Sequence, residues 1–438
     1  MRHQFIGRVA IGPDLRHERG GHAVVFVSQR SSPVSARTDV VVTGLGATTP
    51  LGGDTASTWA AMLAGTSGIT AIEEEWAAGL PVRIAGRLAV EPTELLDRVQ
   101  ARRLDRCEQV ALVAAREAWA DAVRPDVDPE RLAVVIGTGT GGALTMLGQD
   151  DVLEASGVRR VSPHTVPMLM ANGPAAWVSI ELGARGGAHA PVSACASGAE
   201  AIALGLDLIR LGRADVVVAG GAEACICPLT LAGFAQAQAH STRNDAPGLA
   251  SRPFDTGRDG FVIGEGAAVV VLERADFAAA RRAHPYAVLA GAAVTSDAHH
   301  ITAAHPEGQV RAMRRALAAA DLPPLAVDVV HAHATSTPKG DLAEAQSITE
   351  AVGVHPAVTA TKSMTGHLFG AAGALGAVAA VLSVRDGVVP AVRNLDDLDP
   401  EVKLDVVTGG PRTGAVGAAL ANAFGFGGHN ATLVFTPA

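Results

Sequence analysis

The chain has 438 residues, which is enough for two domains or for one fold built from a duplicated unit. Its formal net charge of −9 argues against a protein that binds nucleic acid through its overall charge, and four cysteines are too few for a disulfide framework. The residues are 48% hydrophobic but only 3% aromatic, a composition typical of α/β proteins in which helices pack closely on sheets.

No apolar stretch reaches the roughly 18 uninterrupted residues of a transmembrane helix, so we expect no membrane span. Together with the small number of cysteines, this predicts a cytoplasmic protein in a reducing compartment. Residues 1–37 are rich in arginine and histidine and lack the long apolar core of a signal peptide. We expect them to form a poorly ordered N-terminal extension.

Strands and helices are predicted to alternate from residue 39 onward. Val-, Ala- and Ile-rich runs predict strands at residues 39–46, 132–137, 190–194, 214–219, 266–272, 287–294, 327–332, 358–361, 404–407 and 431–435. Helical patterns lie between them, for example at residues 107–120, 197–211, 309–320 and 370–385. This alternation predicts mainly parallel sheets joined by crossover helices.

The two halves of the chain echo each other in layout. Residues 191–211 follow the same strand, turn and helix pattern as residues 358–385, and residues 134–139 parallel residues 329–334. We therefore expect two related halves, residues 38–285 and 286–438. A duplication would bring equivalent strand ends together, so residues distant in the sequence could share one site.

Cys195 stands out within the run Pro191-Val-Ser-Ala-Cys-Ala-Ser-Gly-Ala199. It follows an expected strand and precedes an expected helix, where the helix N-terminus would lower the pKa of the thiol. An isolated cysteine at such a junction is more often a small core residue. The other cysteines, Cys107, Cys225 and Cys227, are predicted to be structural, because they have no partners at zinc-site spacing.

Three distant segments change the interpretation of Cys195. His333 ends an expected strand and precedes a hydroxyl-rich loop, while Lys362 and His367 follow another strand. A glycine-rich segment at residues 422–430, interpreted as a turn, carries Phe424 and Phe426. Each of these residues alone could be structural, but the set of one thiol, two imidazoles and one ammonium indicates a catalytic site.

In these motifs the chain resembles a β-ketoacyl-acyl carrier protein synthase II, an elongating condensing enzyme of the thiolase superfamily and of the actinobacterial type. Further matching motifs lie at residues 43–50, 137–142, 241–245 and 252–266, and the resemblance covers residues 39–435. It implies a thiolase fold, an α/β fold with duplicated βαβαβαββ halves in five layers, α-β-α-β-α. It also implies a homodimer.

The resemblance implies a role for each site residue. Cys195 would hold the acyl chain, His333 and His367 would donate hydrogen bonds to the enolate oxygen, and Lys362 would act electrostatically. The backbone N–H groups of Cys195 and Phe426 would form an oxyanion hole, and the Phe426 ring would gate the thiol.

Further residues match positions that bind substrate or organise the site. Thr335 and Thr337 match residues that bind the phosphopantetheine arm, and Glu344 matches a buried acid that organises the site. Thr140 and Phe424 would contact the acyl substrate. A cluster of Arg98, Arg102, Arg103 and Arg106, in which Arg102 and Arg103 are the main candidates, would dock an acidic acyl carrier protein. We expect no metal and no cofactor of the protein's own, because phosphopantetheine arrives on the carrier protein.

The implied activity is that of a 3-oxoacyl-[acyl-carrier-protein] synthase, an acyltransferase that condenses malonyl-carrier protein with a Cys-bound acyl chain during fatty-acid elongation. A ketosynthase of a type II polyketide pathway would use the same residues and stays open. A non-catalytic chain-length partner would lack the nucleophile, and an initiating synthase would have Asn where His367 stands. A thiolase would need a second catalytic cysteine after Cys227.

Overall fold

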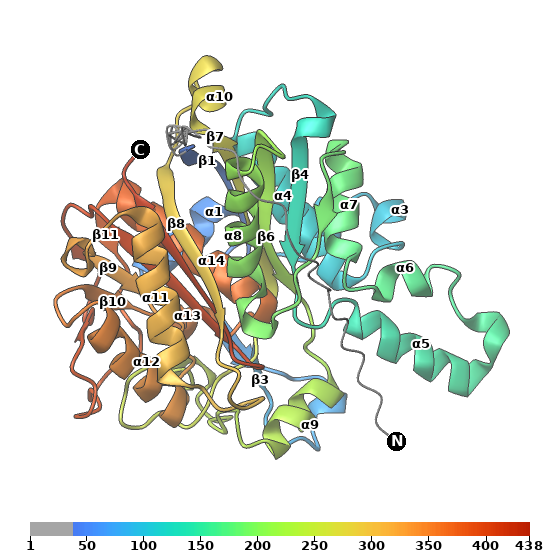
Figure 1. Ribbon diagram of the computed structural model, residues 1–438. Helices are drawn as coiled ribbons and strands as arrows, with labels where there is room; N and C mark the ends of the chain where they lie inside the picture. The colour runs from blue at the N-terminus through green and yellow to red at the C-terminus, as the bar shows by residue number, and fades with distance from the viewer. Residues whose placement is uncertain (1–37) are drawn as a thin grey trace, which may run out of the picture. The chain divides into compact units, whose positions relative to one another are not determined.

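The computed structural model describes residues 38–438, and the expected N-terminal extension lies outside these residues (Figure 1). The described chain contains a large mixed sheet whose central strands are β1 (Val40–Thr48) and β8 (Ala287–Ser296). These two strands pair through only two residues of each, which joins the two halves of the sheet.

The strand order on the two sides of this junction is a mirror image. Outward from β1 run β7 (Gly266–Arg274), β6 (Val216–Glu223), β4 (Leu132–Gly137) and β5 (Ala188–His189). Outward from β8 run β15 (His429–Thr436), β14 (Ala419–Gly425), β9 (Val329–His331), β10 (Ala357–Thr359) and finally β12 (Asp405–Val406). In each half, the last strand therefore lies beside the first: β7 beside β1, and β15 beside β8. This arrangement agrees with a duplicated unit.

The expectation of mainly parallel sheets is wrong. Parallel pairing occurs only at the two outer parts of the sheet, β6–β4–β5 and β14–β9–β10–β12. The six central strands pair antiparallel. β14 and β15 are joined by a turn of three residues, which only antiparallel strands allow.

Helices form three layers around the two halves of the sheet, as Figure 1 shows for the helices between and outside the strands. The central layer consists of α8 (Ser197–Arg210) and α14 (Ala372–Asp386). The outer layers consist of α4 (Arg106–Asp121) and α7 (Gly173–Leu182) on one side, and α11 (Pro306–Ala320) and α12 (Pro338–Ala351) on the other.

Side-chain alternation along the strands explains these layers. In β6, Val217 and Ala219 belong to the core around the central helices, whereas Val216 and Val218 belong to the core around α4. The second half repeats this pattern, because Val329 faces the central helices and Val330 faces the outer pair. The five-layer thiolase fold is therefore confirmed.

The remaining elements are short or lie at the surface of the core. They are α1 (Thr55–Leu63), β2 (Ile69–Ala71), β3 (Ile84–Gly86), α2 (Pro92–Leu95), α3 (Arg98–Ala101), α5 (Ala143–Ser156), α6 (Thr165–Leu169), α9 (Pro228–Gln236), α10 (Ala275–Ala280), α13 (Lys362–Thr365), β11 (Val388–Val389) and β13 (Arg412–Thr413). One helical stretch of the described chain, Phe369–Asp386, is long and apolar enough to cross a membrane, but 89% of it is buried as a core helix.

Candidate active site

Cys195 lies in a tight turn at the start of central helix α8. A 3₁₀ turn over Ala194–Ala196 leads directly into the helix, and Ala194 adopts a left-handed conformation with φ of 51°. The Ser197 hydroxyl fixes the turn, accepting a hydrogen bond from the Ser193 N–H at 3.0 Å. The strand expected at residues 190–194 is absent, because β5 ends at His189 and the following residues make this turn instead.

The structure brings Cys195 together with both predicted histidines. The Cys195 sulfur and one ring nitrogen each of His333 and His367 all lie within 4.8 Å of one another, and all three residues are buried. His333 follows β9 and His367 follows α13, and their rings meet edge to face at a centroid distance of 5.3 Å. Two residues from the second half, one after a strand and one after a short helix, thus face the turn that carries Cys195 in the first half.

The hydrogen bonds of each imidazole determine which nitrogen carries the proton. Lys362 Nζ lies 3.5 Å from His333 Nδ1 and also donates to the His333 carbonyl oxygen, so Nδ1 accepts and Nε2 carries the hydrogen. His367 Nδ1 accepts from the Phe369 N–H at 3.3 Å, and His367 Nε2 has no partner among the described residues. Each ring therefore has an Nε2–H available to donate into the site.

Both histidines are neutral at physiological pH. Burial, followed by the positive charge of Lys362, holds their pKa values well below the ordinary value of 6.5. Burial also lowers the pKa of Lys362 to about 8, against the opposing negative charge of Glu344. Lys362 therefore remains an ammonium at neutral pH, and it stabilises neighbouring negative charge rather than acting as a nucleophile.

Glu344 organises the main chain around His333. Its carboxylate accepts the N–H of His333 at 2.8 Å, the N–H of Ala334 at 2.6 Å and the Asn422 side-chain amide at 3.3 Å. Burial raises the pKa of Glu344 to about 7, and the same backbone donors oppose this rise. The carboxylate thus fixes the direction in which the His333 ring leaves the strand.

The expectation that the helix N-terminus lowers the pKa of Cys195 is wrong. Burial raises the pKa of the Cys195 thiol to about 12, although Lys362 and the N–H groups of Phe426 and Cys195 act in the opposite direction. The resting site therefore holds a thiol. The backbone N–H groups of Phe426 and Cys195 thus lie close to the sulfur.

The segment at residues 422–430 also differs from the turn that we expected throughout. Phe424 lies in β14 and is buried, with its ring 5.9 Å from that of His333. The turn proper begins at Phe426, whose side chain is 45% exposed. Gly425 is required here because an added Cβ would lie 2.4 Å from the Ser193 carbonyl oxygen and 3.1 Å from the Cys195 nitrogen.

The loop after His333 carries the two threonines predicted to bind the phosphopantetheine arm. The hydroxyls of Thr335 and Thr337 lie 3.1 Å apart, and both side chains are half-buried. Ser336 between them has φ of 70° and donates its N–H to Asp341 at 3.0 Å. Asp341 thereby holds the loop in place.

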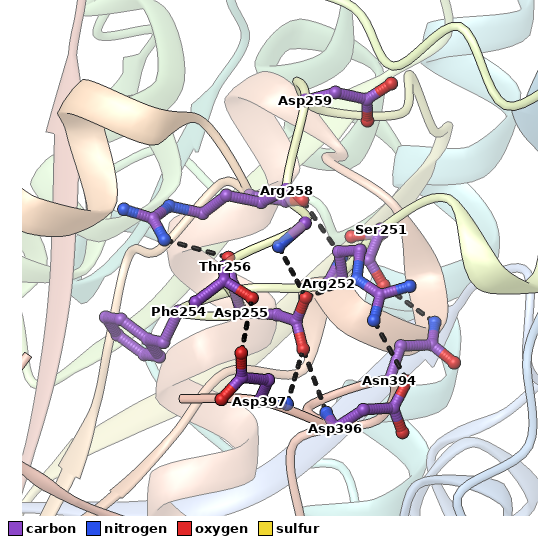
Figure 2. A network of polar contacts seen from close by, with 12 residues as sticks. Ser251, Arg252, Phe254, Asp255, Thr256, Arg258, Asp259, Asn394, Asp396 and Asp397 are labelled. Atoms are coloured by element: carbon purple, nitrogen blue, oxygen red, sulfur yellow. Dashed lines mark hydrogen bonds and ion pairs between the residues drawn. The ribbon is translucent and has the colours of Figure 1, made fainter. Parts of the chain in front are cut away.

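A network of charged side chains supports the same loop (Figure 2). Asp341 accepts the Phe254 N–H at 3.0 Å and lies 3.8 Å from Arg258. Asp255, which follows Phe254 in the sequence, accepts hydrogen bonds from Arg252 Nε and from the Gly257 N–H, each at 2.7 Å. The other oxygen of Asp255 accepts the N–H groups of residues 396 and 397, each at 2.9 Å, and so joins two loops.

Replacing Asp255 with alanine is expected to lower the free energy of unfolding by about 2–4 kcal/mol at pH 7, because several buried donors lose their acceptor. Burial acts to raise the pKa of Asp255, but hydrogen bonds from Arg252 and backbone N–H groups outweigh it and lower the pKa from 3.8 to about 2. The folded protein therefore gains about 2 kcal/mol from this carboxylate above pH 4, which it loses as the pH falls toward 2.

Urea unfolding followed between pH 2 and pH 7 measures both effects. Asp276→Ala is a suitable control, because the Asp276 side chain is 72% exposed where it pairs with Arg274. Equal urea midpoints for wild type and Asp255→Ala would contradict the assigned role of the network.

Thr140 and the candidate docking arginines lie at the surface of the described chain. Thr140 is exposed, and its hydroxyl donates to Glu223 at 2.6 Å. Arg102 and Arg103 are exposed beside α3. Arg106 is not free for docking, because it binds Glu91 at 2.6 Å and Glu265 at 2.7 Å.

Two features of the site were not predicted from the sequence. Phe261 packs edge to face against His367 at 5.7 Å and, with Phe234 and Phe369, forms an aromatic wall beside the histidines. Glu223 lies fully buried beneath the Cys195 turn. The only sequence signal for Glu223 was a charged residue inside an otherwise apolar run.

Comparisons with known proteins agree with this fold. The β-ketoacyl synthase N-terminal domain matches residues 37–278, and the β-ketoacyl synthase C-terminal domain matches residues 286–396. The chain therefore belongs to the β-ketoacyl synthase family of condensing enzymes, which confirms the predicted family and enzyme class.

The chain is similar to enzymes named 3-oxoacyl-[acyl-carrier-protein] synthase 2. The protein of that name from Mycobacterium bovis is 46% identical over 90% of this chain and 96% of the relative, and the one from Synechocystis is 44% identical over 90% and 97%. Among solved structures, the ishigamide ketosynthase/chain length factor has a TM-score of 0.87 at 32% identity, covering 92% of this chain and all of the other. A type II polyketide ketosynthase solved with its acyl carrier protein has a TM-score of 0.85 at 30% identity, with the same coverage.

Proposed function

We propose that this protein is a 3-oxoacyl-[acyl-carrier-protein] synthase that elongates fatty acids by decarboxylative Claisen condensation. The proposal rests on the close approach of the Cys195 sulfur to two neutral imidazoles, those of His333 and His367, in a buried site. A thiol holds an acyl group as a thioester, and two N–H donors stabilise an enolate oxygen.

In the first half-reaction, the Cys195 sulfur attacks the thioester carbon of an acyl chain delivered on a carrier protein. The new Cys–acyl bond replaces the bond to the phosphopantetheine sulfur, which leaves with the thiol proton. The N–H groups of Cys195 and Phe426 lie next to the sulfur, where they can donate to the tetrahedral oxyanion that forms on the adjacent acyl carbon. Because Cys195 rests as a thiol, this proton transfer accompanies the attack.

In the second half-reaction, malonyl-carrier protein replaces the first carrier protein. Loss of CO₂ leaves the bonding electrons as an enolate, whose oxygen accepts the Nε2–H groups of His333 and His367. The enolate carbon attacks the acyl carbon and releases Cys195 as a thiolate, which takes a proton from water to restore the resting thiol. Lys362, 3.5 Å from His333 Nδ1, stabilises the negative charge of the enolate through that ring. Burial strengthens each of these interactions.

The carrier protein is the expected macromolecular partner. Carrier proteins of this pathway are acidic, and Arg102 and Arg103 offer exposed positive charge. Thr335 and Thr337 offer hydroxyls to the phosphopantetheine arm. The protein needs no cofactor of its own in this scheme. All four cysteines are free thiols, which supports a reducing cytoplasmic location.

A type II polyketide ketosynthase is the second candidate function. The solved ishigamide ketosynthase/chain length factor and the type II polyketide ketosynthase share the fold at 32% and 30% identity, but the relatives named 3-oxoacyl-[acyl-carrier-protein] synthase 2 are 43–46% identical. A chain-length partner without activity is disfavoured by the intact set of Cys195, His333, Lys362 and His367.

Incubation with malonyl-carrier protein and acyl-carrier proteins of graded chain length tests the function. We expect CO₂ release in step with a β-ketoacyl product two carbons longer. A folded wild-type protein that releases no CO₂ and makes no product at any chain length would refute the proposal. Successive rounds of condensation without reduction would favour the polyketide alternative.

We also propose that the active protein is a homodimer. β5 is an edge strand, and α5 and α6 have no buried residue and project from the body of the described chain (Figure 1). Met146, Leu153 and Val166 on these helices are large apolar residues exposed to solvent. Thr140, expected to contact the acyl chain, is also exposed, so that a second copy would cover it.

Light scattering after gel filtration is expected to give about 89 kDa, twice the 44.4 kDa of the chain. Val166→Asp is expected to shift the mass toward the monomer and to reduce condensation, because it places a charge in the apolar contact. Val123→Asp, at an exposed valine distant in sequence from α5 and α6, is the control. A wild-type mass of one chain at micromolar concentration would contradict the dimer.

A further inference from the structure

Glu223 is a fully buried carboxylate at the end of β6, and the mechanism above gives it no role. Among the described residues it forms no ion pair, and its charge is balanced only by hydrogen-bond donors. One oxygen accepts the Thr138 hydroxyl at 3.1 Å, the Thr140 hydroxyl at 2.6 Å and the Thr140 N–H at 3.2 Å. The other accepts the N–H groups of Gly139 at 2.7 Å and Gly370 at 3.1 Å.

These donors come from two segments that are far apart in the sequence. Thr138, Gly139 and Thr140 follow β4, whereas Gly370 belongs to the 3₁₀ turn after His367. Glu223 therefore ties the segment expected to contact the acyl chain to the segment that carries a catalytic histidine.

The surrounding glycines leave room for this carboxylate. An added Cβ at Gly139 would lie 2.6 Å from Glu223 Oε2, and one at Gly370 would lie 2.9 Å from the same oxygen. A Cβ at Gly221, on the same strand, would lie 2.3 Å from the Gly370 carbonyl oxygen. The close approach of the three segments thus depends on glycine at each point.

Glu223 also lies close to the turn that carries Cys195. Gly139 donates to Glu223, and a Cβ added to Gly139 would lie 2.6 Å from Glu223 Oε2 and 3.8 Å from the Ala194 carbonyl oxygen of that turn. Burial is the main cause of the raised pKa of the Cys195 thiol; the charge of Lys362 opposes it and the charge of Glu223 adds to it, while His333 and His367 are neutral. Cys107 and Cys225, the other titratable groups that feel Glu223, are buried thiols with raised pKa values. Burial raises the pKa of Glu223 itself, but all five of its partners donate, which favours the ionised form.

We propose that Glu223 is a positioning residue of the condensation site, which holds Thr140 and the turn after His367 in one arrangement and, together with burial, keeps the Cys195 sulfur in the thiol form between turnovers. The first part rests on the proposed function, since it concerns the acyl chain and the decarboxylating histidine. The second part concerns the thiol alone and can be tested without any substrate.

Two variants separate the two parts. Glu223→Gln removes the charge and gives the site an NH₂ group that cannot accept from the Gly139 and Gly370 N–H groups. Thr140→Val keeps the charge and removes one hydroxyl donor. Glu108→Gln is the control, because Glu108 is a fully buried acid on α4 that is not among the main influences on the pKa of the Cys195 thiol.

The first measurement is the rate of iodoacetamide alkylation at Cys195, followed by peptide mass spectrometry between pH 6 and pH 10. Glu223→Gln is expected to react at least about threefold faster at pH 8, because a negative charge near the sulfur is gone. Thr140→Val and Glu108→Gln are expected to react at the wild-type rate. A folded Glu223→Gln protein that reacts no faster than wild type would overturn the electrostatic role.

The second measurement is malonyl decarboxylation and condensation with acyl chains of graded length. Thr140→Val is expected to change the preferred chain length, and Glu223→Gln is expected to lower kcat for every chain by about tenfold or more. Wild-type values of kcat and KM in both variants, at every chain length, would overturn the positioning role. If Glu223→Gln fails to fold, Thr140→Val still decides this part. Alkylation needs no synthase activity, so its outcome is independent of the proposed function.

Discussion

Cys195→Ala is expected to abolish acyl-enzyme formation and to lower condensation by at least about a thousandfold, because no other described thiol faces the two histidines. Intact mass spectrometry after incubation with acyl-carrier protein measures the adduct. Wild type should gain the mass of one acyl group per chain, and the variant should gain none. Decarboxylation of malonyl-carrier protein should persist in the variant, since the histidines and Lys362 that stabilise the enolate remain.

Cys225→Ala is the matched control for this experiment. Cys225 is as deeply buried as Cys195 and its pKa is also raised by burial, but it lies outside the cluster of reactive groups. The control should acylate and condense at near wild-type rates. An acyl adduct that persists at another residue of Cys195→Ala would contradict the assignment of the nucleophile.

His333→Ala and His367→Ala are each expected to lower malonyl decarboxylation by about a hundred- to a thousandfold, because each removes one preorganised N–H donor to the enolate oxygen. Acylation of Cys195 is expected to fall by less than about tenfold, since the backbone oxyanion hole serves that step. CO₂ release and the rate of adduct formation, measured separately, distinguish the two half-reactions. Equal losses in both would show that the histidines act in a different step.

His331→Gln is the control for the histidine variants. His331 is buried in β9 beside the site, but its ring bonds Thr361 at 3.0 Å and does not face Cys195.

Decarboxylation should also depend on the ammonium of Lys362. Since burial lowers the pKa of Lys362 to about 8, wild-type decarboxylation is expected to decline as the pH rises above 8. Lys362→Met should remove this alkaline limb.

Short motifs predicted the residues of the site, because each catalytic group stands where a strand or helix begins or ends. The helix predicted at residues 197–211 corresponds to α8, and the one predicted at residues 107–120 corresponds to α4. The sequence did not predict β14, since Asn422 and Gly425, followed by the glycines of the turn, give this segment the composition of a turn. It is a strand because its neighbours β9 and β15 supply backbone partners on both sides.

Electrostatics could not be predicted in the same way. The position of Cys195 at a helix start predicted a lowered pKa, but burial depends on tertiary packing and dominates. The sequence groups Arg106 with neighbouring arginines as a basic surface. In the fold it forms ion pairs with Glu91 and Glu265, and the sequence alone does not predict these pairs. The role of Glu223 could not be predicted for a related reason, because its five hydrogen-bond donors come from other parts of the chain.

The mirrored strand order gives the molecule a chemical division of labour. Both central helices begin after a 3₁₀ turn whose first residue is left-handed, Ala194 with φ of 51° and Phe369 with φ of 42°. By this correspondence, the counterpart of Cys195 in the second half is Gly370. The first half thus carries the thiol proposed to hold the acyl group, and the second half carries the histidines and the lysine proposed to stabilise the enolate. Carbon–carbon bond formation by the proposed mechanism therefore requires both halves, whereas loss of CO₂ depends on groups of the second half.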